Sequence, residues 1–320
     1  MATDGGGPER VAVIDTGTNS TRLLVADVSN GMVDELDRRT RVTRLGEGVD
    51  RSGHLEGPAK DRVRQCVSGY AEVIEKLGAE RAIIIATSSV RDAANGGQFL
   101  AELARSHSSQ GRTFSYRILS GNQEAALSFK GSTMETDPSL RVLLFDIGGG
   151  STEVAAGSGG NVEYARSLRL GCVRLSERML KSDPPAAGEL AAAAAYIDAL
   201  FDSEIDRQAV SVPDLAMGVA GTITALAAID LGLEVYDRAR VHCHRLTRGC
   251  VDSWLSKLAA MTVAEKMDCF PTMEPGRADV IVGGALIASR LLRYTGVEEF
   301  AVSERDILDG AAVALADGVI

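Results

Sequence analysis

The chain has 320 residues, of which 45 % are hydrophobic and 34 are glycine, a composition typical of a well-packed α/β enzyme with two domains. Its formal charge of −10 argues against nucleic acid or an anionic membrane as a partner, because both favour a basic surface. The sequence has no membrane-spanning apolar run, no signal peptide and no Cys-x-x-Cys pair among its five cysteines. We therefore expect a cytoplasmic protein with reduced thiols.

The first predicted element is a β-hairpin, because in residues 13–25 (VIDTGTNSTRLLV) two apolar runs flank an Asp and a Gly-bearing turn. Later in this half, apolar residues recur at helical spacing from Val63 to Leu77, and Gly78 ends the helix. The remaining predicted elements are strands at 41–48, 81–89 and 113–120 and a helix at 96–106. Together they give the order βββαβαβ.

A second hairpin, predicted in residues 144–156 (LFDIGGGSTEVAA), opens a similar series. It continues with a strand at 161–170, helices at 174–180 and 187–208, a strand, Gly-turn and helix at 215–229, helices at 250–260 and 276–294, a strand at 298–303 and a helix at 305–318. We expect two similar domains facing each other across a cleft, the first of residues 1–125 plus 305–320 and the second of residues 126–304.

The two hairpins carry the same polar residues in one frame. The matching pairs are Asp15 and Asp146, Gly17 and Gly148, Ser20 and Ser151, and Thr21 and Thr152, followed by a change from Arg22 to Glu153. A Gly-bearing turn lets backbone N–H groups approach a phosphate, and neighbouring hydroxyls add donors. One such turn is often only a hairpin turn, but the pair predicts two phosphate cradles.

The two Asp residues of this pattern stand at strand ends, where we expect them to hold Mg²⁺. Arg22 is predicted to donate charge-assisted hydrogen bonds to phosphate. Glu153 would repel phosphate, so a role toward metal, water or a proton suits it better.

Five segments follow one another along the chain: VIDTGTNSTRLLV, ATSSVRDAAN, ILSGNQEAALSFKG, FDIGGGSTEV and GVAGTITALAAI. In these segments and their order the chain resembles, from about residue 11 to its end, the exopolyphosphatase / guanosine pentaphosphate phosphatase (Ppx/GppA) family. The resemblance implies an α/β fold of the actin/Hsp70/sugar-kinase (ribonuclease H-like) type, with duplicated βββαβαβ domains and a central cleft. Thr16 and Thr18 depart mildly from the family pattern.

Glu124, in ILSGNQEAAL, is predicted at the first turn of a helix that begins where the domains join. A carboxylate there can activate a water against a terminal phosphate, and the resemblance implies the same, since the family's proposed base lies on this motif. Members often have two adjacent Glu, whereas here the first is Gln123. The alternative is that Glu124 only favours the helix N-terminus.

Arg91 follows a buried strand and resembles a phosphate-binding arginine. The alternative, which weighs equally without the family resemblance, is a surface arginine paired with Asp92. GVAGTIT is either an anion site at a helix N-terminus or a point of close packing. The predicted catalytic residues are Glu124, Glu153 and Asp146, and the predicted metal ligands are Asp15, Asp146 and Glu153. The predicted phosphate-binding residues are Thr18, Asn19, Ser20, Arg22, Arg91, Gly148, Gly149, Gly150, Ser151, Thr152, Gly221 and Thr222.

Two basic clusters either line a path for phosphates or are solvated faces. The first comprises Arg38, Arg39, Arg41 and Arg44, and the second comprises Arg238, Arg240, His242, His244, Arg245 and Arg248. The close pair of histidines suggests zinc only weakly, because Cys243 and Cys250 lack the usual ligand spacing.

The preferred function is an exopolyphosphatase that releases terminal orthophosphate from inorganic polyphosphate by metal-assisted water attack, with Mg²⁺ or alternatively Mn²⁺. The alternatives are a 5′-phosphohydrolase of guanosine pentaphosphate (pppGpp), an actin-like-fold ATPase or sugar kinase, and a non-catalytic nucleotide sensor. Short polyphosphates are the expected substrates, because the chain stops after its second domain and has two modest arginine clusters. The family also implies a homodimer.

Overall fold

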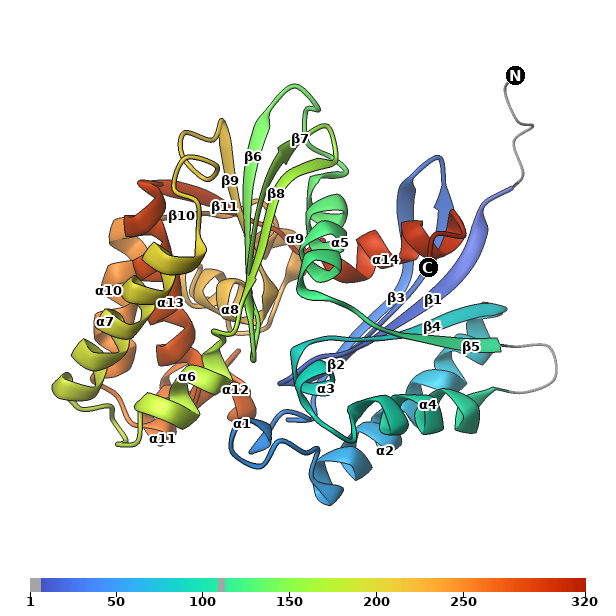
Figure 1. Ribbon diagram of the computed structural model, residues 1–320, viewed down its shortest axis with the longest axis horizontal. Coiled ribbons are helices and arrows are strands. Elements are labelled where there is room, and N and C mark those ends of the chain that lie inside the picture. The colour runs from blue at the N-terminus through green and yellow to red at the C-terminus, as the bar shows by residue number, and fades with distance from the viewer. Residues whose placement is uncertain (1–6, 109–112) are drawn as a thin grey trace. The chain divides into compact units, whose positions relative to one another are not determined.

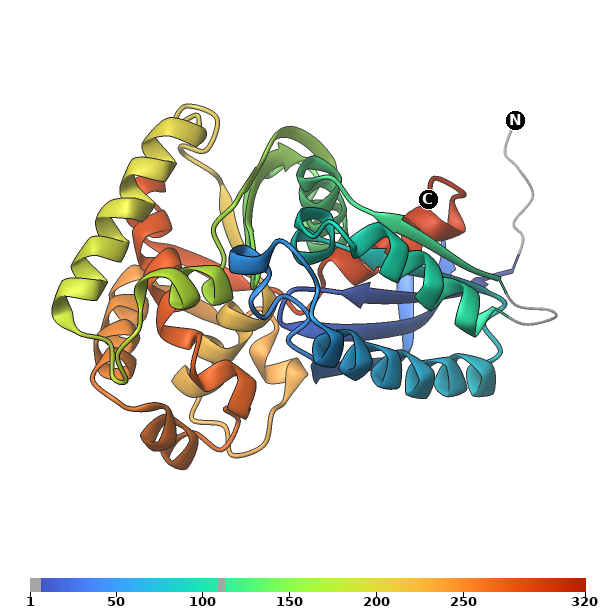
Figure 2. The same cartoon turned by 60° about the horizontal axis from the view of Figure 1, so that its bottom comes forward.

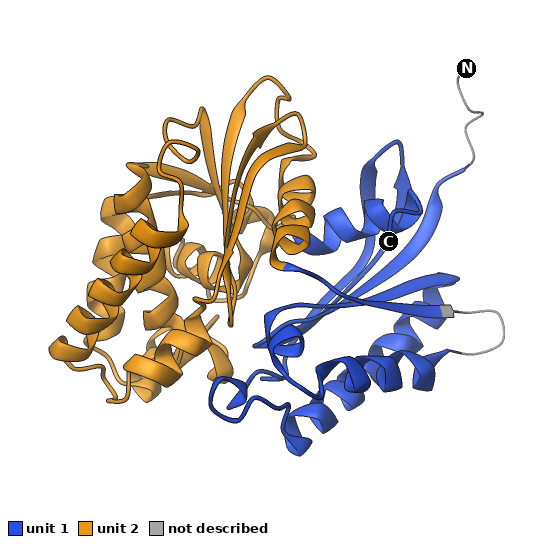
Figure 3. Cartoon of the chain, viewed as in Figure 1, with its two compact units in different colours: residues 1–120, 307–320 blue, residues 121–306 orange. Residues whose placement is uncertain are grey.

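The computed structural model describes residues 7–108 and 113–320. The chain divides into two compact units, each with its own sheet and hydrophobic core (Figures 1 and 3). Unit 1 comprises Met1–Ser120 and Ile307–Ile320, and unit 2 comprises Gly121–Asp306. No helix among the described residues is long and apolar enough to cross a membrane.

Unit 1 is built on a five-stranded sheet in the order β3-β2-β1-β4-β5. Its strands are β1 (Glu9–Thr16), β2 (Ser20–Ser29), β3 (Met32–Val42), β4 (Arg81–Ala86) and β5 (Thr113–Ile118). Its helices are α1 (Val49–Ser52), α2 (Gly57–Leu77), α3 (Ser88–Asp92), α4 (Gly96–His107) and α14 (Ile307–Ala316).

The helices of unit 1 cover both faces of its sheet. Alternate residues of β1 point to opposite faces, and Ala12 and Ile14 join the core beneath α2 and α4, which lie side by side (Figure 2). The helix α14 packs on the opposite face, against β1 and β2 (Figure 1). Gly78 ends α2 in the left-handed conformation, as the sequence predicts.

Unit 2 contains a six-stranded sheet in the order β10-β11-β9-β6-β7-β8. Its strands are β6 (Arg141–Ile147), β7 (Thr152–Ser158), β8 (Asn161–Leu168), β9 (Leu215–Val219), β10 (Arg245–Thr247) and β11 (Glu299–Val302). Its helices are α5 (Gly121–Thr133), α6 (Cys172–Met179), α7 (Ala187–Glu204), α8 (Ala220–Asp230), α9 (Arg238–Val241), α10 (Arg248–Ala259), α11 (Val263–Cys269), α12 (Pro275–Ala278) and α13 (Ile281–Thr295).

The two sheets repeat one topology. In unit 1, β1, β2 and β3 form an antiparallel meander, and β4 and β5 continue the sheet parallel to β1. In unit 2, β6, β7 and β8 form the same meander, and β9 and β11 take the places of β4 and β5. This duplication confirms the α/β fold of actin-like type expected from the sequence.

Several bounds differ from the sequence-based expectations; for example, the strand expected at 81–89 ends at Ala86, and Ser88 and Ser89 begin α3. Three further differences have a cause in hydrogen bonding or packing. The third strand runs from Met32 to Val42 and not over 41–48, because beyond Val42 the amides of Thr43 and Arg44 both donate to the Asn19 carbonyl and leave the ladder. The helix expected at 276–294 is two helices, since the Val280 amide bonds the Arg277 carbonyl and tightens the end of α12. The division between units falls after Ser120, because α5 packs on β6, β7 and β8 of the second sheet.

Candidate active site

The hairpin between β1 and β2 is closed by a hydrogen bond of 2.9 Å from the Gly17 amide to the Ser20 carbonyl. The register places Arg22 opposite Asp15 on the neighbouring strand. The Arg22 guanidinium donates to Asp15 Oδ2 from Nε at 3.0 Å and from Nη2 at 2.7 Å. The predicted phosphate ligand and the predicted metal ligand of unit 1 therefore neutralise each other.

The predicted phosphate-binding residues of unit 1 lie in this hairpin and on α3. Thr18 Oγ1 lies 2.9 Å from Ser88 Oγ at the start of α3, and Thr16 Oγ1 donates to the Ile85 carbonyl. Both departures from the family pattern are thus buried hydroxyls with hydrogen bonds. Arg91, also on α3, donates from Nη1 to the Leu119 carbonyl at 2.8 Å.

The hairpin between β6 and β7 has the same closure, from the Gly148 amide to the Ser151 carbonyl at 3.0 Å. Its outward carbonyls cap α6: Gly148 accepts from the Cys172 amide, and Gly149 accepts from the amides of Val173 and Arg174. This contact requires Gly171, because a Cβ there would lie 2.4 Å from the Gly149 carbonyl carbon.

The turn also offers donors. Within the described part of the chain, no group accepts a hydrogen bond from the Gly149 or Gly150 amide. Two adjacent N–H groups without an internal acceptor are the backbone feature that phosphate cradles use. Ser151 and Thr152 are buried, and Thr152 Oγ1 donates to the Leu170 carbonyl at 2.6 Å.

Beside this turn, the structure brings together the three predicted catalytic carboxyl groups. Asp146 and Glu153 face each other across β6 and β7, and Glu124 comes from α5. The Glu124, Asp146 and Glu153 residues are only 7, 8 and 2 % exposed. Close approach of α5 to β8 makes this possible, since a Cβ on Gly121 would lie 2.2 Å from the Ser167 Cβ.

The cluster has an unfavourable charge balance. Burial raises the pKa of Glu153 well above its ordinary value, and the Glu124 and Asp146 carboxylates raise it further, while hydrogen bonds from Ser167 and Ser151 act in the opposite direction. The two hairpins therefore differ in kind. That of unit 1 holds an Asp–Arg ion pair, and that of unit 2 holds like charges that a cation would relieve.

Comparison with known proteins decides what kind of protein carries this arrangement. The model of the Ppx/GppA phosphatase family matches residues 24–317. The chain belongs to the Ppx/GppA phosphatase family. It is 37 % identical over 316 residues to exopolyphosphatase 2 of Mycobacterium tuberculosis, covering 96 % of this chain and 98 % of the relative.

Two further relatives lie in the same family. The crystal structure of an exopolyphosphatase-like protein superposes with a TM-score of 0.88 at 33 % identity, covering 97 % of this chain and 100 % of that one. A guanosine-5′-triphosphate,3′-diphosphate pyrophosphatase of Vibrio cholerae is 31 % identical over 220 residues, covering 69 % of this chain and 43 % of the relative. The chain is therefore a phosphatase of the hydrolase class.

Ppx/GppA phosphatases generally depend on a divalent metal ion, and the carboxylates of unit 2 fit one in chemistry. Their oxygens are the ligands that hard cations prefer, and their mutual repulsion favours a positive charge among them. No group of three or more His, Cys, Asp and Glu side chains in the described residues has the arrangement of a ready metal site. The fit is that of a cation held by one or two carboxylates, with further oxygens from water or phosphate.

Replacing Glu153 by Gln is expected to stabilise the metal-free protein, and more at pH 8 than at pH 5. Since the folded-state pKa of Glu153 is raised, the folded protein keeps a proton that the unfolded chain loses above its ordinary pKa of 4.5. Between pH 4.5 and the raised pKa, the free energy of unfolding of the unmodified protein therefore falls as pH rises, by up to about 1.4 kcal/mol per pH unit. Urea unfolding in EDTA should show a gap between the proteins that widens with pH. A gap independent of pH would contradict the raised pKa.

The GVAGT segment lies at the same edge of the sheet, because Asp146 pairs with Val219 at the end of β9. The Gly221 carbonyl accepts a hydrogen bond from the Arg277 guanidinium. Thr222 is buried against α13, where a Cβ on Gly284 would lie 2.3 Å from its Oγ1. The contacts of Gly221 and Thr222 are thus those of close packing. Phosphate binding by these two residues stays a prediction.

Three residues of this region were not predicted. Ser128 donates to Asp146 Oδ2 at 2.8 Å, Ser167 donates to Glu153 Oε1 at 2.6 Å, and Arg174 donates from Nε to the Gly150 carbonyl at 2.8 Å. Ser128 lies one helical turn after Glu124, and that spacing was the available signal. Ser167 and Arg174 depend on strand register and helix packing, which no local pattern reveals.

Proposed function

We propose that the protein is an exopolyphosphatase, which releases terminal orthophosphate from inorganic polyphosphate by attack of water. The observation that carries the proposal is the buried cluster of Glu124, Asp146 and Glu153 beside a turn with two N–H groups available to phosphate. The relationship to exopolyphosphatase 2 over nearly the whole chain supports this substrate.

In the proposed reaction, Glu124 accepts a proton from the attacking water, whose oxygen bonds the terminal phosphorus while the bond to the bridging oxygen breaks. The Gly149 and Gly150 amides bind phosphate oxygens in unit 2, and Arg22 and Arg91 are the proposed phosphate-binding residues of unit 1. Phosphoryl transfer depends mostly on such positioning and charge neutralisation, so no nucleophilic Cys or Ser is required.

We further propose Mg²⁺, with Mn²⁺ as the alternative, held by Asp146 and Glu153. Bound there, the ion would neutralise charge on the transferred phosphoryl group. Ser128 donates to Asp146 and Ser167 donates to Glu153, so each carboxylate is oriented by a neighbouring hydroxyl. Asp15 is the weaker candidate ligand, because its Oδ2 already accepts two hydrogen bonds from Arg22.

Asp146→Asn should raise the metal concentration needed for half-maximal activity more than it weakens polyphosphate binding, because a neutral amide is a poor ligand for a hard cation. Asp15→Asn should act in the same direction but less strongly, since the Arg22 pair already occupies that carboxylate. Titrating Mg²⁺ against phosphate release compares the two variants. An unchanged titration in Asp146→Asn would rule out the proposed ligand.

The arginine clusters support a preference for short chains. Arg38 pairs with Glu35 and Asp309, and Arg39 pairs with Asp37. In the second cluster, Arg238 pairs with Glu304, Arg245 with Glu299 and Arg248 with Glu298. Arginines neutralised by carboxylates add little to the binding of a polyanion at cellular salt, where screening acts over about 8 Å.

Long polyphosphate should therefore be released after few cleavages. With limiting enzyme, products resolved by length should show gradual shortening of the whole population. Full-length chains coexisting with fully degraded ones would show processive hydrolysis. That result would contradict the proposed weak binding of long chains by the arginine clusters.

A second candidate substrate is pppGpp, favoured by the Vibrio cholerae relative, because the same phosphoanhydride chemistry serves both molecules. Phosphate release from polyphosphate, pppGpp and ATP measured side by side separates the candidates. Rapid hydrolysis of pppGpp alone would replace the first proposal, and hydrolysis of ATP alone would favour an actin-like ATPase. The homodimer implied by the family stays a prediction for sedimentation analysis.

A further inference from the structure

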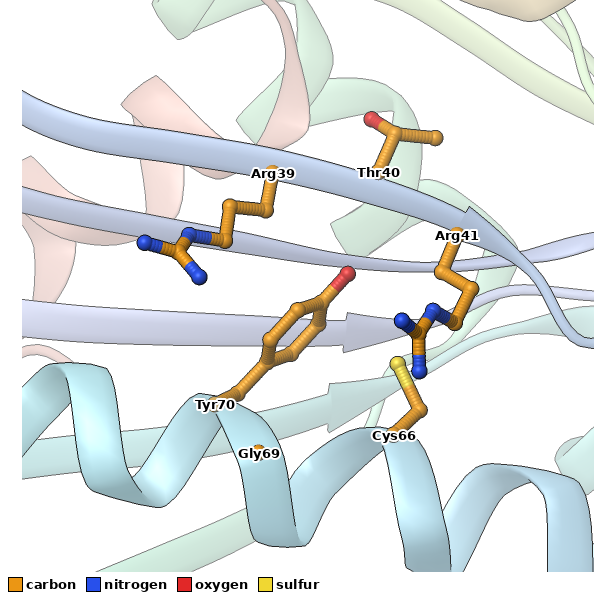
Figure 4. Close-up of a pocket in the computed structure, with 6 residues that line it drawn as sticks. All are labelled: Arg39, Thr40, Arg41, Cys66, Gly69 and Tyr70. Carbon is orange, nitrogen blue, oxygen red and sulfur yellow. The ribbon is translucent and has the colours of Figure 1, made fainter.

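Unit 1 contains a hollow between β3 and α2, with a volume of about 340 Å³ and a partly polar lining (Figure 4). Its lining residues come from these two elements and are Arg39, Thr40, Arg41, Cys66, Gly69 and Tyr70. Arg39 and Arg41 belong to the first basic cluster, and the other four residues have no role in the proposed hydrolysis. The hollow therefore requires an account of its own.

The geometry of a strand and a helix explains why these residues meet. Arg39 and Arg41 alternate along β3 and so lie on one face, about 7 Å apart along the strand. Cys66 and Tyr70 are one turn apart on α2 and face them. Figure 4 shows Arg41 directed toward Cys66, with the Tyr70 ring between the two arginines.

Gly69 keeps the helix side of the hollow open. It lies inside α2 and not at a cap, and a Cβ built on it would meet no atom within 4 Å. An alanine would fit there without a clash and would favour the helix. A larger side chain at this position would instead enter the open space.

The charges in the hollow are not balanced. Arg39 is held by Asp37 through two hydrogen bonds of 2.8 and 2.9 Å. Arg41 has no carboxylate partner among the described residues. Burial raises the pKa of the Cys66 thiol and of the Tyr70 hydroxyl, so both facing groups are neutral at pH 7 and do not offset the Arg41 charge.

We propose that this hollow is a second binding site for a phosphoryl oxyanion, separate from the hairpin between β1 and β2. Arg41 supplies the main contact, because its planar guanidinium can donate two parallel hydrogen bonds to a tetrahedral anion. Arg39 adds a second guanidinium group from the same face of β3. Neutral walls and an arginine without a carboxylate partner favour an anion even in a chain of net charge −10.

The hollow is connected to the phosphate hairpin through one residue. The Tyr70 hydroxyl donates a hydrogen bond of 3.0 Å to the Thr21 carbonyl, and Thr21 directly precedes Arg22. Thr21 is also the residue that pairs with Arg41 across β2 and β3. An anion beside Tyr70 thus contacts the groups that fix the backbone at Arg22.

Calorimetric titration of the full chain with inorganic phosphate, and separately with tripolyphosphate, tests the proposal in the Glu124→Gln background, where turnover is suppressed. We expect Arg41→Gln to weaken one class of binding by at least about tenfold. Gly69→Leu, which fills the hollow without removing a charge, should have the same effect. Arg207→Gln, which changes an exposed arginine outside both basic clusters, is the matched control and should bind as the parent does.

The two titrants separate the sources of the anion. Equal or tighter binding of inorganic phosphate at the Arg41-dependent site identifies the released product as its ligand, whereas much tighter binding of tripolyphosphate identifies a polyphosphate chain. Diffraction from crystals soaked in tungstate, a tetrahedral oxyanion with strong anomalous scattering, should place a peak beside Arg41. If Arg41→Gln and Gly69→Leu both bind like Arg207→Gln, the proposal is wrong. Binding is measured without turnover, so failure of the proposed exopolyphosphatase activity would leave this result intact.

Discussion

Replacing Glu124 by Gln is expected to lower the rate of phosphate release by about 10² to 10⁴, while the fold and substrate binding persist. The amide keeps the shape of the side chain but cannot accept the proton of the attacking water. Glu124 is buried at the start of α5, close enough to Glu153 to raise the pKa of that carboxyl. Single-turnover hydrolysis of tripolyphosphate, with binding measured separately, checks the expectation.

The matched control for this variant is Glu102→Gln, which removes a carboxylate from the exposed side of α4 and should leave turnover unchanged. If Glu124→Gln retained more than half of the parent rate, the base would lie elsewhere. Glu153 would then be the next candidate, since its raised pKa also suits a group that exchanges protons.

Replacing Arg22 by Lys should lower kcat/KM roughly ten- to a hundredfold although the charge is retained. The Arg22 guanidinium directs both Nε and Nη2 to one oxygen, Asp15 Oδ2, and the same two donors can bond two oxygens of a phosphate. An ammonium group supplies charge without that fork. Arg207→Lys, at an exposed arginine outside both basic clusters, is the control. Near-parent kinetics of Arg22→Lys would mean that Arg22 contributes only its charge.

The sequence predicts well those elements whose signal is local. Both hairpins follow from an Asp and a Gly-bearing turn between apolar runs, and α2 follows from its helical periodicity and Gly78. The strand β3 was placed too late, because its segment MVDELDRRTRV is mostly charged and its pairing with β2 depends on the sheet. The break between α12 and α13 could not be predicted, because the residues there, Asp279 and Val280, are neither proline nor glycine.

In the candidate site, too, the features with a local sequence signal could be predicted and those that depend on packing could not. Its residue types could be predicted, because the repeated hairpins and the Glu124 motif are local patterns. Its electrostatics could not, since the Asp15–Arg22 pair depends on hairpin register, and the crowding around Glu153 depends on how α5 packs against β8. Ser128 and Ser167 acquire their roles only through that packing.

The capping of α6 by the glycine turn has a mechanical consequence. Three amides of α6 bond the carbonyls of Gly148 and Gly149 at 3.0, 2.9 and 3.1 Å, and breaking them would strand polar groups in a buried place. Turn and helix therefore move as one rigid body. Further along α6, Ser176 lies so close to α13 that a Cβ on Gly283 would be 2.7 Å from its Oγ. If phosphate binding displaced the turn, the displacement would therefore pass through α6 to α13, a helix in the core of unit 2.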